Sequence, residues 1–236
     1  MPFGQAYFNG WSLAHFECTC FAGFGIDQGM GEREMAPQVL LFDVGGVLAD
    51  WDGTTPLVEL TEGRFDRDRA RRFWLEFEPL VPFETGRASV HEFTGPAVEA
   101  LGLDMSREEF AARFDSWMAG PFEGAMALLE RIRPAFIRAV LSNNNPMHWN
   151  RFVEQSQIDR HVEHLFVSHE IGLRKPDHEA FDHVMQALGQ PAEAFHFFDD
   201  NPECVEAARQ LGMQASLVRG VAELEAALEA EGCLSS

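Results

Sequence analysis

The sequence has few positive charges and no long hydrophobic run. It contains 18 lysine and arginine residues against 38 aspartate and glutamate residues, which gives a formal net charge of −20 at pH 7. Such a charge argues against a nucleic-acid backbone or an anionic membrane as partner. No apolar stretch reaches the ~18 residues expected of a membrane-spanning helix. A small anionic substrate is still compatible with this charge if a metal ion and a lysine reverse the field locally.

Cysteine is also scarce. The four cysteines are Cys18, Cys20, Cys204 and Cys233. No second Cys or His pair follows Cys18 and Cys20 at zinc-finger spacing, which disfavours a zinc site. A disulfide framework is not expected in a chain of 236 residues, because such frameworks are typical of small secreted domains. The sequence therefore predicts a reducing, cytoplasmic location.

Residues 1–34 differ in composition and periodicity from the chain that follows them. Residues 1–34 hold many aromatic residues and glycines without helical or strand periodicity, and they lack the basic region of a signal peptide. Just before Val39, the first residue of an apolar run, stands Met35. We therefore predict that the folded domain begins near Met35 and that residues 1–34 are a disordered or non-native extension.

The remainder of the chain predicts an α/β fold. From Phe122 onward, helical patterns alternate with short apolar strands at residues 136–141, 164–167, 195–198 and 214–218. This alternation predicts a Rossmann-like parallel sheet with helices on both faces. Residues 35–53 and 121–236 would form this core. Residues 54–120 contain helical patterns and no convincing strand, so we expect them to form a small helical cap inserted after the first strand.

Polar residues follow directly on three of the expected strands. Asp43 ends the apolar run that begins at Val39, Ser142 follows another strand, and Asp199-Asp200 follows a third. Ligands of parallel sheets bind beyond the carboxyl ends of the strands. An ionised carboxylate buried without a partner is costly, so Asp43 is expected to face a metal ion or a phosphate pocket. These side chains should therefore meet in one crevice.

The ordered set Asp43, Ser142-Asn143, Lys175-Pro176 and Asp199-Asp200 resembles the motifs of the haloacid dehalogenase superfamily. The resemblance covers roughly residues 39–218. The segment Phe42-Asp43-Val44-Gly45-Gly46-Val47 is similar to the first motif of the branch typified by alpha-D-glucose-1-phosphate phosphatase, F-D-x-G-[NG]-V. The segments 84–87, 141–143, 172–176 and 197–201 also resemble that branch.

The resemblance and the chemistry together imply roles for these residues. Asp43 would attack phosphorus and form an aspartyl-phosphate. Lys175 would neutralise the nucleophile, while Ser142, Asn143 and the turn at Gly45–Gly46 would bind the phosphoryl oxygens. The ligands of a Mg²⁺ ion would be Asp43, the carbonyl of Gly45, Asp199 and Asp200.

One departure concerns proton transfer. Most phosphatases of the superfamily carry a second aspartate two residues after the first, whereas this chain has Gly45 there. General acid–base help is typically worth ~10²–10⁴ in rate. Another residue or water could substitute, the leaving group could need little help, or activity could be low or absent. The candidate substitutes are His91, Glu84, Asp50 and Asp52.

Three alternatives to a phosphatase can be weighed on the residues. A metal-independent dehalogenase would find Asp199-Asp200 an electrostatic burden. A phosphonate-cleaving relative would need a cap lysine, and no lysine precedes Lys175. Gly45 keeps open a catalytically silent phosphate-binding protein. We expect a Mg²⁺-dependent phosphatase that acts on a small phosphorylated metabolite, possible examples being sugar phosphates, with no nucleic-acid or membrane partner. The sequence leaves the oligomeric state open.

Overall fold

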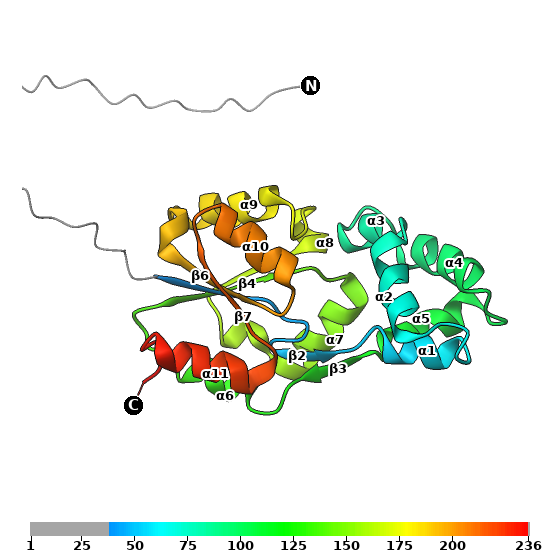
Figure 1. The fold of residues 1–236 in the computed structure, drawn as a ribbon, viewed down its shortest axis with the longest axis horizontal. Coiled ribbons are helices and arrows are strands. Elements are labelled where there is room, and N and C mark those ends of the chain that lie inside the picture. Colours follow the sequence, from blue (N-terminus) through cyan, green and yellow to red (C-terminus); the bar gives the residue numbers. More distant parts are fainter. Residues whose placement is uncertain (1–37, 236) are drawn as a thin grey trace, which may run out of the picture. The chain divides into compact units, whose positions relative to one another are not determined.

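The computed structural model describes residues 38–235, and its centre is a five-stranded parallel sheet (Figure 1). The strands run in the order β5-β4-β1-β6-β7, and each neighbouring pair is parallel. They are β1 (Val39–Phe42), β4 (Ile137–Ser142), β5 (His164–Val167), β6 (Phe195–Asp199) and β7 (Gln214–Leu217). The prediction of a Rossmann-like α/β fold is confirmed. The expectation for residues 1–34 concerns a part of the chain outside the described residues.

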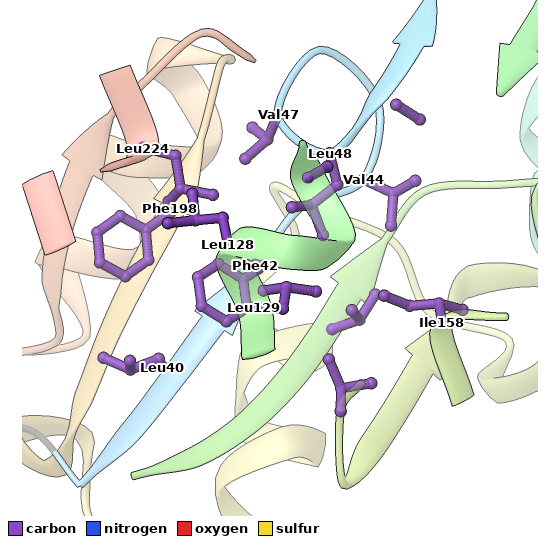
Figure 2. Packing of buried hydrophobic residues seen from close by; sticks show 14 of the residues in the cluster. Leu40, Phe42, Val44, Val47, Leu48, Leu128, Leu129, Ile158, Phe198 and Leu224 are labelled. Atoms are coloured by element: carbon purple, nitrogen blue, oxygen red, sulfur yellow. The ribbon is translucent and has the colours of Figure 1, made fainter. Parts of the chain in front are cut away.

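Helices cover both faces of this sheet because its strands are apolar on both sides. Leu40 and Phe42 of β1 pack into one hydrophobic cluster with residues of helices α6, α7 and α11 (Figure 2), whereas Val39 and Leu41 pack on the other face with α9 and α10. These helices are α6 (Ala125–Glu130), α7 (Pro146–Ser156), α9 (His178–Leu188), α10 (Pro202–Gln210) and α11 (Gly220–Ala230). Burying each large apolar side chain stabilises the fold by roughly 1.5–3 kcal/mol.

Short elements complete the connections around the sheet. The one-turn helix α8 (Ser168–Ile171) follows β5 directly. Two 3₁₀ turns, Ile158–Arg160 and Ala192–Ala194, precede β5 and β6. No helix within residues 38–235 is long and apolar enough to cross a membrane.

Five helices between residues 55 and 115, which we call the cap helices, share a hydrophobic cluster of their own. They are α1 (Thr55–Leu60), α2 (Arg67–Glu76), α3 (Leu80–Glu84), α4 (Val90–Leu101) and α5 (Arg107–Asp115). Aromatic rings dominate this cluster: Phe83 stacks on Phe93 with ring centroids 4.4 Å apart, and Phe93 contacts Phe114 at 5.1 Å. In Figure 1 the cap helices lie beside the carboxyl ends of the strands.

The expectation that residues 54–120 contain no strand is wrong. The segment β3 (Met118–Pro121) pairs in antiparallel fashion with β2 (Ala49–Trp51). Neither strand has the alternating pattern that identifies a strand from sequence, and their pairing is between residues far apart in the chain. The resulting ribbon brings together the two points at which the chain leaves the sheet for the cap helices and returns from them.

Candidate active site

The carboxyl edge of the sheet collects an acidic cluster. Asp43 follows β1, Asp199 is the last residue of β6, and Asp200 comes next. Because β1 and β6 are neighbours, carboxylate oxygens of these three residues lie within 4.8 Å of one another. Asp43 and Asp199 are buried, with 8% and 1% of their surface exposed, and Asp200 is partly buried. The structure therefore brings together the three acidic residues that the sequence singled out.

Lys175 supplies the positive charge of this cluster. Its Nζ donates to Asp43 Oδ1 at 2.7 Å and to Asp199 Oδ2 at 2.6 Å, and the residue is 2% exposed. It is also the only lysine in the sequence. Buried charges are stable only when they are paired and hydrogen-bonded, which both carboxylates achieve here. The orientation of the Asp43 carboxylate is thereby fixed.

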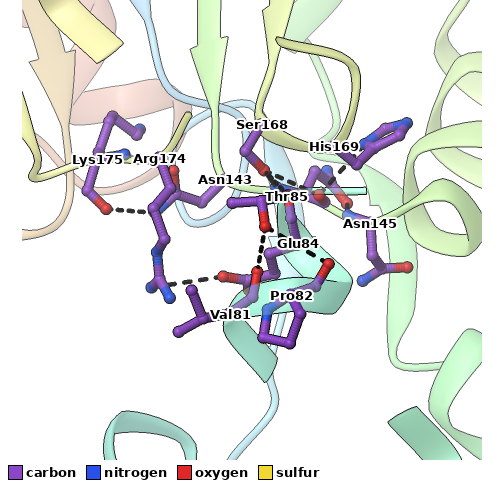
Figure 3. A network of polar contacts seen from close by, with 11 residues as sticks. Val81, Pro82, Glu84, Thr85, Asn143, Asn145, Ser168, His169, Arg174 and Lys175 are labelled. Carbon is purple, nitrogen blue, oxygen red and sulfur yellow. Dashed lines mark hydrogen bonds and ion pairs between the residues drawn. The ribbon is translucent and has the colours of Figure 1, made fainter. Parts of the chain in front are cut away.

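Asn143 holds Lys175 in place from the end of the neighbouring strand. Its Nδ2 donates to the Lys175 carbonyl at 2.7 Å, and its Oδ1 accepts from the Lys175 amide at 2.8 Å. The side-chain amide of Asn143 is thus occupied by the backbone of Lys175 (Figure 3). Any contact of Asn143 with a phosphate is therefore left to its backbone.

The electrostatics of the cluster follow from three carboxylates around one amine. Burial raises the pKa of Asp43 above its usual range, Lys175 opposes the rise, and Asp199 and Asp200 add to it. Burial and the neighbouring Asp199 likewise raise the pKa of Asp200. Burial alone would lower the pKa of Lys175, but Asp199 and Asp43 outweigh it and raise the pKa, so the amine stays protonated. The cluster has more negative charge than its lysine balances.

This donor set fits a divalent cation. Carboxylate oxygens are the hard ligands that Mg²⁺ prefers, and the ion's charge would offset the surplus of the three acids. Gly46 contributes by its lack of a side chain: its φ is +73°, and a Cβ atom there would lie 2.4 Å from Asp200 Oδ2. Gly45, the neighbouring residue of the same turn, lines the cavity described below.

Ser142 has an orphaned hydroxyl at this edge. The residue ends β4 and is 1% exposed, and its Oγ has no hydrogen-bond partner among the described residues. A buried hydroxyl without a partner is unfavourable by about 1–3 kcal/mol. A phosphoryl oxygen bound beside β1 and β4 would relieve this deficit, because it can accept the bond that the protein does not.

Polar contacts connect the cap helices with the core next to this cluster. Arg174 lies 3.4 Å from Glu84 Oε2, and the Ser168 hydroxyl donates to the Glu84 carbonyl at 2.6 Å (Figure 3). Gly86 approaches so closely that a Cβ atom there would lie 2.2 Å from the His169 carbonyl oxygen. Segment 84–86 at the end of α3 is therefore packed directly against α8 and the residue before Lys175.

The four candidate proton donors lie in different places. Glu84 lines a cavity together with Gly45, and its Oε2 is shielded from solvent without a hydrogen-bond partner. Burial raises the pKa of Glu84, with Arg174 opposing the rise. His91 is exposed and contacts Arg107. Asp50 is also exposed and lines a separate cavity.

Asp52, the fourth candidate, serves the beginning of helix α1. Its Oδ1 accepts from the backbone amides of Thr54 and Thr55 at 2.8 and 3.0 Å. Partial burial alone would raise the pKa of Asp52, but hydrogen bonds from Thr55 and Thr54 outweigh it and lower the pKa. A carboxyl group with a lowered pKa is a poor proton donor near neutral pH.

Sequence reasoning missed His148, which joins α7 to the cap helices. Its Nε2 lies 2.7 Å from the Phe114 carbonyl and must donate to it, so Nδ1 accepts from the Asn145 amide at 3.0 Å. Burial lowers the pKa of His148 to about 4, which keeps the imidazole neutral. Asn145 itself caps α7 by accepting from the amides of Met147 and His148. A polar turn before a helix was the only sequence signal for this arrangement.

Fold and site together define a parallel α/β protein in which a carboxylate at a strand end is held by a lysine beside further carboxylates. Comparison with known proteins identifies the family. The family model of haloacid dehalogenase-like hydrolases matches residues 37–212. The chain therefore belongs to the haloacid dehalogenase-like hydrolases, and it is an enzyme of that family.

Individual relatives agree with this assignment. Over 191 residues the chain is 29% identical to phosphatase MT3486 of Mycobacterium tuberculosis, covering 78% of this chain and 88% of the relative. It is 24% identical to D-ribitol-5-phosphate phosphatase of Bacteroides thetaiotaomicron, covering 74% and 88% of the two chains. Among solved structures, the enzyme bt-2542 of B. thetaiotaomicron, in complex with magnesium and inorganic phosphate, is similar in fold, with a TM-score of 0.64, 24% identity, and coverage of 76% and 93%.

Proposed function

We propose that this chain is a Mg²⁺-dependent phosphatase that hydrolyses a small phosphate monoester through an aspartyl-phosphate on Asp43. The observation that carries the proposal is the placement of Lys175 Nζ between Asp43 and Asp199, with Asp200 in the same cluster. The names of the relatives, two of them phosphatases, support hydrolysis of phosphate esters.

In the first step, an oxygen of Asp43 attacks the phosphorus atom and forms a P–O bond, while the bond from phosphorus to the ester oxygen breaks. Lys175 donates to Oδ1 of Asp43 and orients the carboxylate for attack. The Ser142 hydroxyl and the backbone near Asn143 and Gly46 would hold the phosphoryl oxygens. Bound by Asp43, Asp199, Asp200 and the Gly45 carbonyl, Mg²⁺ would shield the negative charges that attack brings together.

The departing ester oxygen needs a proton, and Glu84 is the donor that we propose. Among the residues that the structure describes, it is the one charged residue that lines the cavity beside Gly45, and burial raises its pKa. A carboxyl group with a raised pKa retains a proton nearer to neutral pH and can deliver it to an alkoxide. Glu84 would thereby perform from the cap helices the role that Gly45 cannot.

In the second step, water attacks the phosphorus of the aspartyl-phosphate. The bond between phosphorus and Asp43 breaks, inorganic phosphate leaves, and the carboxylate is regenerated. Glu84, deprotonated after the first step, would accept the proton of the attacking water. The cap residues 54–120 would exclude bulk water during both steps and contribute to specificity.

The test is a phosphate-release assay on the purified full-length chain with acetyl phosphate, whose leaving group is small. We expect turnover with Mg²⁺, none with excess EDTA, and recovery when Mg²⁺ is restored. Asp43→Asn should abolish turnover because its amide is no nucleophile, and Glu170→Gln, an exposed change on α8, is the matched control that should retain it. Equal turnover with and without EDTA would contradict the proposed metal dependence.

A catalytically silent phosphate-binding protein is the second candidate, favoured by the glycine at position 45. It would bind inorganic phosphate, which calorimetry can detect, but it would release none from any monoester. A metal-independent dehalogenase is less compatible with Asp199 and Asp200, because two extra carboxylates would repel a carboxylate nucleophile and a haloacid.

A further inference from the structure

A cavity of about 180 Å³ lies between the strand ends and the cap helices. Gly45 and Asn143, neighbours of the acidic cluster and of Ser142, form part of its wall. Much of the remaining wall is apolar: Trp51, Trp74, Leu80, Phe114 and Met118 all line it. The cavity therefore begins beside the proposed phosphate position and extends into the aromatic cluster of the cap helices, where the alcohol part of a monoester would lie.

Most polar groups in this wall are already hydrogen-bonded within the protein. Trp74 Nε1 donates to the Gly53 carbonyl at 2.8 Å, so the indole offers its ring to the cavity. Both nitrogens of His148 are occupied by Phe114 and Asn145. The side-chain amide of Asn143 is occupied by Lys175. A ligand with several hydroxyl groups would lose water here and gain few partners in return.

The charge of the wall is equally restrictive. Glu84 is the only charged residue that lines the cavity, and no lysine or arginine does so within the described part of the chain. A second phosphate or a carboxylate on the leaving group would find no cation among the described residues of this wall, and Arg174 beyond it is already paired with Glu84 at 3.4 Å. The leaving group that suits this wall is therefore uncharged.

We propose that the substrate is the phosphate monoester of a small, uncharged, apolar alcohol whose carbon skeleton is about the size of one six-membered ring. This inference rests on the proposed phosphatase function. An apolar protein cavity of about 150 Å³ accommodates benzene, so the volume here, about 180 Å³, suits such a group. This inference departs from the sugar phosphates that the sequence motifs suggested. The aromatic wall would bind the ring while the phosphate lies at Asp43.

The first experiment compares cyclohexylmethyl phosphate with glucose 6-phosphate on the full-length enzyme with Mg²⁺. Both are phosphates of a primary alcohol on a six-membered ring, and they differ in the hydroxyl groups and the ring oxygen of the sugar. We expect kcat/KM to be at least about tenfold higher for the cyclohexyl compound, because apolar burial favours it and unpaired hydroxyls oppose the sugar. Equal or higher kcat/KM for glucose 6-phosphate would overturn the inference.

Acetyl phosphate separates this inference from the proposed function. If Mg²⁺-dependent turnover of acetyl phosphate is observed and the sugar phosphate is preferred, only the apolar specificity is wrong. If neither acetyl phosphate nor the two ring compounds are hydrolysed, the phosphatase proposal fails, and the substrate class that depends on it is overturned as well.

A variant pair tests the wall itself. Trp74→Ala removes an indole from the cavity, whereas Leu75→Ala, on the same helix with Leu75 80% exposed, is the matched control. Trp74→Ala should lower kcat/KM for cyclohexylmethyl phosphate at least about fivefold more than kcat/KM for acetyl phosphate, whereas Leu75→Ala should change neither. A uniform loss on both substrates in Trp74→Ala would contradict a specificity role.

Binding provides a readout that does not require turnover. Isothermal titration calorimetry with benzylphosphonate and methylphosphonate, which cannot be hydrolysed, should give a Kd at least about tenfold lower for the benzyl compound. Trp74→Ala should reduce this ratio, and Leu75→Ala should preserve it. Equal affinity of the wild-type protein for the two phosphonates would count against an apolar binding wall.

Discussion

Lys175 is the residue on which the acidic cluster depends. In Lys175→Met, Asp43 and Asp199 would remain buried without the ammonium that lies 2.7 and 2.6 Å from them. Breaking a buried charge pair by removing one partner typically costs about 3–5 kcal/mol. We therefore expect urea denaturation at pH 7 to show a loss of that size, together with a loss of phosphatase activity.

The matched control is Arg131→Met, which breaks surface ion pairs with Glu225 and Glu229, where the side chains of Arg131 and Glu225 are 47% and 36% exposed. Exposed pairs are worth about 0–1 kcal/mol, so this variant should remain close to wild type. Similar losses in the two variants would mean that Lys175 has no special energetic role.

Two buried histidines make the stability depend on pH. Burial lowers the pKa of His148 and of His196 to about 4, whereas a histidine in the unfolded chain titrates near about 6.5. As the pH falls below that value, the unfolded state binds protons that the folded state does not. The contribution of each histidine to the free energy of unfolding is therefore complete above about pH 6.5 and decreases as the pH falls toward 4. Between pH 7 and pH 5 the decrease is about 2 kcal/mol per histidine.

Urea denaturation of His196→Phe at pH 7 and pH 5 checks this expectation. His196 is 3% exposed, its Nδ1 has no hydrogen-bond partner among the described residues, and its Nε2 lies 2.8 Å from Ser216 Oγ. A phenyl ring matches the imidazole in shape and removes the titration, and the lost Ser216 contact affects the variant equally at both pH values. The variant should lose about 2 kcal/mol less than wild type over this pH range. His178→Gln, an exposed change, should retain the full loss. The same pH dependence in both variants would show that His196 does not contribute.

At the scale of single residues, the sequence identified Asp43, Ser142, Asp199 and Asp200 because each one follows a recognisable strand. Lys175 does not follow directly on a strand, and it was predicted as a site residue from the resemblance to the superfamily motifs. Glu84 was one of four candidates that composition could not separate. Only the closure of α3 over the strand ends distinguishes it, and that closure depends on contacts between residues distant in sequence, such as Ser168 with the Glu84 carbonyl.

The contact between α3 and α8 is the element-level feature that holds the cap helices over the site. Gly86 has φ +69°, and a Cβ atom there would lie 2.2 Å from the His169 carbonyl oxygen. Gly86→Ala must therefore displace segment 84–86 from α8. We expect a stability loss above about 2 kcal/mol, from steric overlap added to the strain of a left-handed backbone, and at least about a tenfold fall in kcat/KM because Glu84 moves with the segment.

Gly63→Ala is the control for backbone strain alone. Gly63 has a similar φ of +74°, but nothing lies within 4 Å of its Cβ position. Its substitution should cost about 1–2 kcal/mol and leave kcat/KM unchanged. Thermal denaturation and steady-state kinetics of both variants provide the measurements, and equal kinetic effects would rule out a specific role for the Gly86 contact.

Elements with local signals were predictable, and those without them were not. The spacing of Ser89 and Glu92, and of Ser106 and Glu109, is a local signal for a capping box, and such boxes begin α4 and α5 in the structure. Pro96 lies inside α4, and the helix nevertheless continues from Val90 to Leu101 with Phe93, Ala97 and Leu101 buried. The β2–β3 ribbon was missed because its pairing is entirely nonlocal.

For the whole molecule, the alternation of helices and strands predicted the parallel sheet, but it could not predict the cavity. The walls of the cavity come from the turn after β1, β2 and the residues that follow it, α2, α3, α5, β3, the turn after β4 and α7. The shape of such a cavity depends on how the cap helices pack against the sheet, and no segment of the chain encodes that packing by itself. The apolar character of the wall therefore became visible only in three dimensions.

The net charge of −20 is expected to slow the association of an anionic substrate with the enzyme. A phosphate monoester is itself an anion, so the field of the protein opposes its approach even though Lys175 and Arg174 attract it locally. Salt shortens the reach of this field from about 30 Å at 0.01 M to about 8 Å at 0.15 M. We expect kcat/KM to rise severalfold between these ionic strengths while kcat stays constant, because the repulsion acts on association.

A triple variant, Glu108→Lys, Glu206→Lys and Glu229→Lys, changes three exposed positions outside the proposed site and brings the net charge from −20 to −14. It should show a higher kcat/KM at low salt and a weaker dependence on ionic strength, since less repulsion remains to be screened. A kcat/KM that falls as salt is added would contradict the expectation. It would mean that the substrate responds mainly to the positive groups at the site entrance, and that the acidic surface lies too far away to influence its approach.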